Sequence, residues 1–84
     1  MNIFIKGVTL PVTLSSLKND LDSGPILFIP NPTSSYYISK SESDGIVFEH
    51  FISLGLHTFH FRLCISLNDA YIILLGILEN RLML

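Results

Sequence analysis

Hydrophobic and polar side chains alternate most regularly between residues 57 and 67. One parity is largely apolar and the other is polar or small: the first comprises His57, Phe59, Phe61, Leu63, Ile65 and Leu67, and the second comprises Thr58, His60, Arg62, Cys64 and Ser66. A period of two over this length is typical of a β-strand. The pattern therefore predicts a strand whose polar parity is either a working site or simply its solvated face.

A second strand is predicted directly before the first. Residues 46–53 are mostly apolar, and Leu54-Gly55 provides a turn signal before the next strand begins. Adjacent strands with a short connection usually pair as a hairpin. We expect this hairpin of residues 46–53 and 57–67 to lie at the centre of a sheet.

The N-terminal segment, residues 2–14, is rich in apolar and β-branched residues and predicts another strand. We expect a break in it near Gly7 or Pro11, because proline cannot donate a hydrogen bond to a central ladder. The leucines that follow, at positions 14, 17 and 21, have helical spacing. Thr13 or Ser15 as the N-cap, with Gly24 and Pro25 as the stop signal, predicts a helix of about two turns.

The next two segments differ sharply in polarity. Residues 25–30 form an apolar run between two prolines and predict a buried strand of about four residues. Residues 30–45 are rich in Pro, Ser and Asn, which favour turns. We expect this second stretch to be the most mobile part of the chain, with a short strand at most over 36–39.

The segment 69–82 fits a helix slightly better than a strand. Asn68 is a good N-cap, and Asp69 suits the positive end of a helix dipole. However, Tyr71 and the two isoleucines that follow it prefer strands, and Asn68-Asp69 would also suit a hairpin turn. Together the segments predict a single α+β domain over residues 1–84. It has an antiparallel sheet of four to five strands, a short helix in the N-terminal half and a C-terminal helix over one face, with an all-β fold as the alternative.

The composition has an excess of apolar residues, which predicts exposed apolar surface. Of the 84 residues, 49% are hydrophobic and only 14% are charged, so a small globule cannot hide all its apolar side chains. Exposed apolar patches mark contacts with protein or lipid. The five basic residues are scattered along the chain, which argues against a nucleic-acid partner. Abundant Ile, Leu, Ser and Asn with a single Ala is often seen in small proteins of viruses and mobile elements.

Cys64 is the only cysteine, which rules out an intrachain disulfide and predicts a reducing, cytoplasmic location. We expect its thiol to be buried and inert, because free cysteine packs like a small hydrophobic residue. On a straight strand, His60 and Cys64 are about 13 Å apart, too far to share a zinc ion. Only a helix would align them with His50 and His57 as a metal-binding stripe. We therefore expect no metal, no cofactor and no catalytic thiol, with His50 and His57 making ordinary hydrogen bonds.

The sequence therefore predicts a non-enzymatic protein–protein interaction module: an inhibitor, adaptor or assembly subunit that binds another protein or itself as a homo-oligomer. The candidate contact residues are aromatic or lie on the polar parity of the 57–67 strand: Tyr36, Tyr37, His60, Arg62 and Tyr71. One alternative is a peripheral membrane protein anchored by residues 70–82, whose nine-residue apolar run is too short to span a bilayer. A second alternative is a metal-binding protein using the His/Cys cluster.

Overall fold

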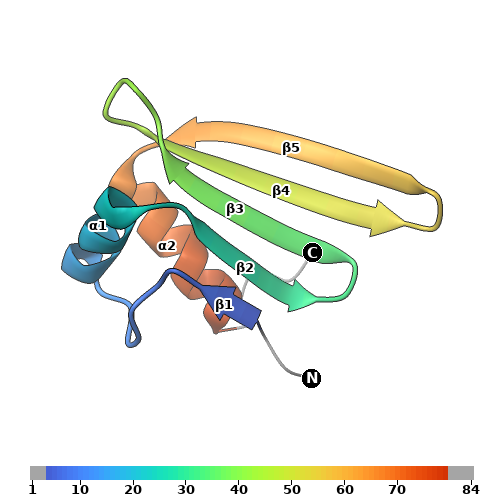
Figure 1. Ribbon diagram of the computed structural model, residues 1–84, viewed down its shortest axis with the longest axis horizontal. Helices are drawn as coiled ribbons and strands as arrows, with labels where there is room; N and C mark the ends of the chain where they lie inside the picture. The colour runs from blue at the N-terminus through green and yellow to red at the C-terminus, as the bar shows by residue number, and fades with distance from the viewer. Residues whose placement is uncertain (1–3, 80–84) are drawn as a thin grey trace.

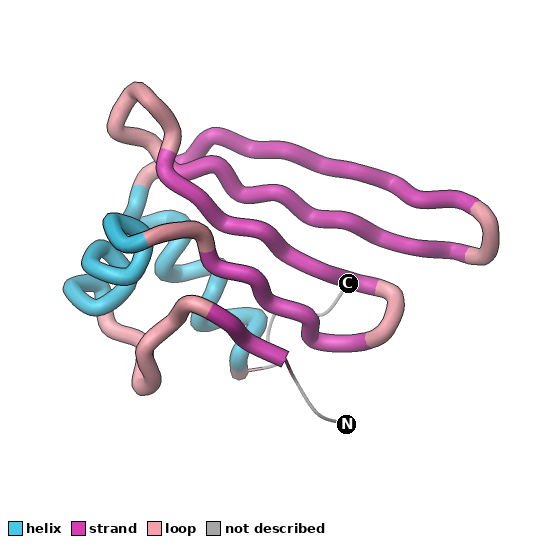
Figure 2. Tube along the Cα trace, viewed as in Figure 1, coloured by secondary structure: helices cyan, strands magenta, loops and turns pink. Residues whose placement is uncertain are grey.

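The computed structural model describes residues 4–79. Over this range the chain forms a mixed structure of strands and helices in the order β1 (Phe4–Lys6), α1 (Leu14–Ser23), β2 (Ile26–Asn31), β3 (Ser34–Lys40), β4 (Ile46–Leu54), β5 (His57–Ile65) and α2 (Leu67–Leu78). The described strands form one five-stranded antiparallel sheet in the order β1-β2-β3-β4-β5 (Figures 1 and 2). The predicted α+β class is confirmed.

The predicted hairpin forms, but not where it was expected. β4 and β5 pair over nine residues without a register shift, from Ile46 opposite Ile65 to Leu54 opposite His57. β5 is an edge strand, and β3 occupies the middle of the sheet. The prediction of a central hairpin was wrong because every consecutive strand pairs with its predecessor, which leaves the last strand at the edge.

Both helices pack on the same face of the sheet (Figure 1). The largest fully buried side chains come from β2, β3 and the two helices: Leu17, Ile26, Phe28, Ile38 and Leu74. They form a single hydrophobic cluster between the helix layer and one sheet face. The opposite face is covered by neither helix, so β2 and β3 alternate between a buried and a more accessible side.

Local sequence signals explain where α1 begins and ends. The Thr13 hydroxyl accepts a hydrogen bond from the Ser16 amide at 3.0 Å, and the Thr13 amide donates to Ser16 Oγ at 2.9 Å. This reciprocal pair is a capping box, which satisfies backbone groups that the first turn leaves free. Gly24 caps the other end. The helix is ten residues long, so the prediction of two turns was too short.

α2 is a helix, as favoured from the sequence. Ser66, and not Asn68, is its N-cap: the Ser66 hydroxyl accepts a hydrogen bond from the Asp69 amide at 3.1 Å. Ala70, Leu74 and Ile77 recur at helical spacing and are buried, so tertiary packing outweighs the strand preference of the isoleucines. The helix ends at Leu78, and the predicted residues 80–82 lie outside the described range.

Two of the strand predictions need correction. β2 is not buried on both sides, because only alternate residues such as Ile26 and Phe28 face the helices. Its pairing with β3 is irregular between Phe28 and Asn31, a stretch that contains Pro30. The polar stretch that follows contains the seven-residue strand β3, and Tyr36 and Ile38 of that strand are buried. A few inward side chains on a central strand are enough to order an otherwise polar segment.

Candidate interaction surface

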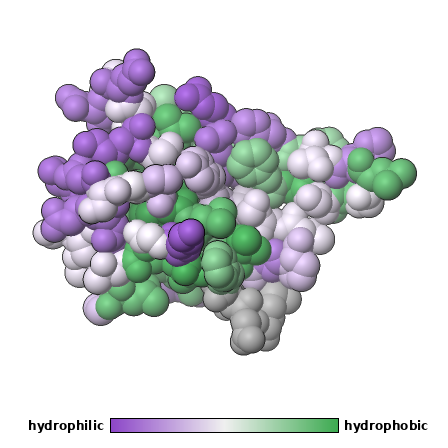
Figure 3. Space-filling view, in the orientation of Figure 1, coloured by the Kyte–Doolittle hydropathy of each residue, from purple (hydrophilic) through white to green (hydrophobic). Residues whose placement is uncertain are grey.

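The β4–β5 hairpin projects from the body of the molecule, beyond the helices (Figure 1). Its two strands are joined by the two residues Gly55 and Leu56, and Gly55 adopts the left-handed conformation, with φ of 61°. Such short turns favour glycine because it tolerates a positive φ. Leu54 and Leu56 are exposed at the tip, where Figure 3 shows hydrophobic residues at the projecting end. We call β4, the turn and β5 the projecting hairpin.

The apolar parity of β5 is exposed. Phe59, Phe61 and Leu63 are 47%, 55% and 57% accessible, although they share the sheet face on which the helices pack. The alternation correctly divided the residues between two faces, but β5 lies too far along the sheet for the helices to cover it.

The other face of the projecting hairpin carries a polar cluster. His60 Nε2 lies 2.7 Å from Glu49 Oε2, and the His60 ring stacks on Phe51 with centroids 4.4 Å apart and planes 2° apart. Arg62 is directly opposite Glu49 in the register. His60 and Arg62, both predicted contact residues, are therefore accessible and lie together beside one carboxylate.

An aromatic row connects the projecting hairpin to the core. Tyr36 is buried and stacks on His50, whose ring in turn lies 6.4 Å from that of Phe61. His50 Nε2 is 2.6 Å from Ser34 Oγ, so the ordinary hydrogen bond expected for this histidine is present. Burial lowers the pKa of His50 and raises the pKa of the Tyr36 hydroxyl.

The remaining candidate contact residues are dispersed. Tyr37 lies on the open face of the sheet and is exposed, whereas its neighbour Tyr36 packs inward. Tyr71 is half-buried on α2 against the hydrophobic core. Sequence reasoning missed the three accessible side chains Phe59, Phe61 and Leu63. Their alternation was visible, but nothing local to the strand indicates that it lies at an edge.

The histidines and the cysteine do not converge. In the β4–β5 register, His50 and His57 share the helix-side face, whereas His60 and Cys64 lie on the opposite face. Within residues 4–79, no group of three or more His, Cys, Asp or Glu side chains is arranged to hold a metal ion. Cys64 is exposed, so the expectation of a buried thiol was wrong, because Cys64 lies on an edge strand and on the sheet face that neither helix covers.

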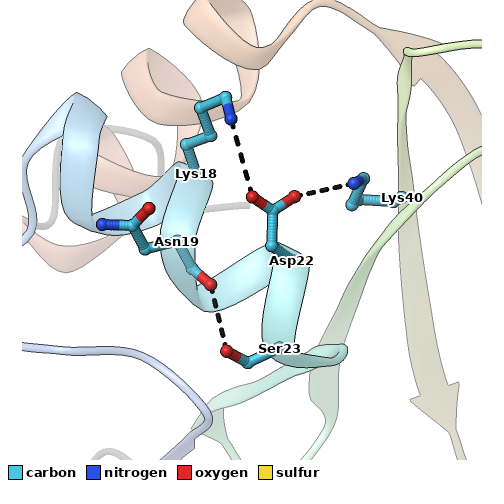
Figure 4. A network of polar contacts seen from close by, with 5 residues as sticks. All are labelled: Lys18, Asn19, Asp22, Ser23 and Lys40. Atoms are coloured by element: carbon cyan, nitrogen blue, oxygen red, sulfur yellow. Dashed lines mark hydrogen bonds and ion pairs between the residues drawn. The ribbon is translucent and has the colours of Figure 1, made fainter.

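A second polar cluster lies between α1 and β3. Asp22 contacts Lys40 at 2.7 Å and Lys18 at 3.5 Å, as Figure 4 shows. The hydrogen bond with Lys40 is the main cause that lowers the pKa of Asp22, and the same bond raises the pKa of Lys40. These side chains border a shallow hollow of about 300 Å³. The contact between Asp22 and Lys40 ties α1 to β3, and Lys18 reaches the same carboxylate from within the helix.

Among the described residues, none of the helices has both the length and the apolar character needed to cross a bilayer. Comparisons with protein-family models, with curated proteins and with solved structures found no match.

Proposed function

We propose that this chain is a non-enzymatic protein–protein interaction module whose contact surface is the projecting hairpin. The observation that carries this proposal is the exposure of Phe59, Phe61 and Leu63 in a row on an edge strand. Contiguous exposed apolar side chains mark binding surfaces, and aromatic residues are favoured as anchors there. His60 and Arg62, on the other face of the same strand, add groups that donate hydrogen bonds to a partner.

The alternative of a peripheral membrane protein, anchored by residues 70–82, fits the structure less well than a protein partner does. Membrane-surface helices combine an exposed apolar face with a basic polar face. In α2 the apolar residues Ala70, Leu74 and Ile77 are directed into the core, and the helix has no basic residue in its last turn. The anchor proposed for residues 70–82 would have to unpack this helix from the sheet first.

The metal-binding alternative receives no support from the geometry. The four candidate ligands are divided between two faces of a sheet, so bringing them to one ion would require breaking the β4–β5 ladder. The exposed polar groups of the projecting hairpin are instead accessible to a partner chain, which supports the proposal.

Site-specific photocrosslinking in cells of the source organism tests the proposal. The photoreactive residue p-benzoylphenylalanine replaces Phe61 in one variant and Ile72 of α2 in the other, because both side chains are 55% exposed and apolar. We expect protein adducts from position 61, and few or none from position 72. Adducts at position 61 no more abundant than at position 72 would contradict the proposed function.

A further inference from the structure

We propose that the partner of β5 is β5 of a second copy of this chain, paired antiparallel about a twofold axis that passes through Phe61. The two sheets then join into one continuous sheet. This inference rests on the proposed function and deepens it by naming the partner.

Within the described part of the chain, β5 is an edge strand with little of the usual protection. In an antiparallel ladder, alternate residues direct their N–H and C=O groups away from the paired strand, so half of the backbone groups of β5 face outward. Proteins protect such edges with lysine, proline, bulges or short strands. β5 has nine residues and an unbroken register, and Arg62 is its only charged residue apart from histidines. The other edge, β1, has three residues and includes Lys6.

The limits of β5 define one register for full overlap. In a twofold antiparallel pair the numbers of opposed residues have a constant sum, and directly opposed side chains share one face. β5 extends from His57 to Ile65. Complete overlap therefore places Phe61 opposite Phe61 of the second copy. Any shift from this register removes backbone hydrogen bonds at both ends.

The same register matches the side chains. Phe59 comes to lie opposite Leu63 of the second copy, and Leu63 opposite its Phe59, so three apolar pairs form on the helix-side face around the twofold axis. Cross-strand aromatic and aliphatic pairs of this kind stabilise antiparallel sheets. The exposed apolar row of the strand would then contact the same row of the second copy along its length.

Like-charge repulsion opposes a neighbouring register. On the other face, Arg62 lies opposite His60 of the second copy, which Glu49 holds at 2.7 Å in its own sheet. A shift by one pair toward the C-terminal end would instead place Arg62 opposite Arg62, and like charges directly opposed are destabilising. The register with the longest overlap therefore also avoids this repulsion.

The helices do not obstruct the edge. α1 contacts β3 and α2 contacts β4, and Figure 1 shows both helices lying away from the length of β5. The twofold axis is perpendicular to the sheet, so the helices of both copies lie on the same side, separated by the two projecting hairpins. Strand pairing therefore requires no rearrangement of the core.

Sedimentation velocity over a range of concentrations tests the association. We expect the purified chain to form a dimer, and Phe61→Asp to raise the dimer dissociation constant by about 100-fold, because two carboxylates would meet at the axis where two rings are lost. Ile72→Asp, at an equally exposed position on α2, should leave the constant unchanged. A monomeric wild type, or equal effects of both substitutions, would overturn the proposal. Circular dichroism verifies that each variant is folded.

Disulfide trapping tests the register. The proposed pairing places Thr58 opposite Cys64 of the second copy, at a Cα separation of about 5.5 Å that a disulfide can bridge. Within one chain the same two positions are about 20 Å apart, so an intrachain bridge cannot form. Under mild oxidation, Thr58→Cys should give a covalent dimer, whereas the wild type and the double variant Thr58→Cys/Cys64→Ser should not. A dimeric Thr58→Cys variant that remains unbridged would overturn this register.

The two proposals fail in different ways. Photocrosslinks from position 61 to another protein, with a purified chain that stays monomeric, would remove the homodimer and leave the interaction module in place. An absence of specific crosslinks at position 61 would remove both. Crosslinks between two copies, together with the Thr58→Cys bridge, would support both.

Discussion

Tyr36 of β3 and His50 of β4 lie face to face across the sheet, with ring centroids 4.1 Å apart and ring planes within 8°. The hydroxyl of Ser34 is 2.6 Å from His50 Nε2, and the ring of Phe61 approaches from β5. These neighbours leave His50 only 8% exposed. A titratable ring therefore lies where the packed core meets the projecting hairpin.

The position of His50 predicts a pH dependence of stability. Burial lowers its pKa below the value of about 6.5 in the unfolded chain, so the unfolded chain binds more protons between the two values. The contribution of neutral His50 to the free energy of unfolding is complete above about pH 6.5. It is lost as the pH decreases toward the folded-state pKa. Urea titrations from pH 7.5 to 5.5, at fixed protein concentration, should show this decline.

One substitution tests whether His50 is responsible for this decline. His50→Gln should flatten the pH dependence, whatever its effect on absolute stability. An unchanged slope in His50→Gln would assign the proton uptake to another group.

α1 provides a matched test of the core. Leu17 is fully buried, whereas Leu14, one turn earlier on the same helix, is 41% exposed. Leu17→Ala should lower the free energy of unfolding by about 2–5 kcal/mol, because it removes buried methyl groups and leaves a cavity. Leu14→Ala should cost less than about 1 kcal/mol. Chemical denaturation measures both, and similar losses would contradict the assigned orientation of α1.

Gly7 should be the most sensitive glycine of the described turns. Its φ is +89°, and a Cβ added there would lie 2.8 Å from the carbonyl oxygen of Pro25. Gly7→Ala should therefore destabilise the fold by about 1–3 kcal/mol through backbone strain and steric contact. Gly55 also has a positive φ but has open space around it, so Gly55→Asn should have a much smaller effect. Thermal unfolding of the two variants provides the comparison.

The N-cap of α1 predicts a smaller, local effect. Thr13→Ala removes the hydroxyl that accepts from the Ser16 amide, and should cost about 1 kcal/mol. Ser15→Ala changes a neighbouring hydroxyl that lies inside the helix, and should be neutral or slightly stabilising because alanine favours helices. Equal losses in denaturant titrations would argue against Thr13 as the cap.

The sequence alone predicts most elements of the fold, because their signals are local. The Thr13 cap and the Gly24 stop delimit α1, and the alternation from His57 to Ile65 identifies β5 as a strand. The same signals are ambiguous where competing preferences balance. Tyr71 and its isoleucine neighbours favour a strand, and only the burial of Ala70, Leu74 and Ile77 against the sheet explains why α2 is a helix.

Only the tertiary structure decides which side chains are covered. A period of two places Phe59 and Phe61 on one face and His60 and Cys64 on the other, but it carries no information about which layer packs on either face. That depends on the order of the strands and on how far the helices extend, and both are set by contacts between residues distant in the sequence. The exposed thiol of Cys64 and the accessible phenylalanines of β5 follow from its place at the edge of the sheet.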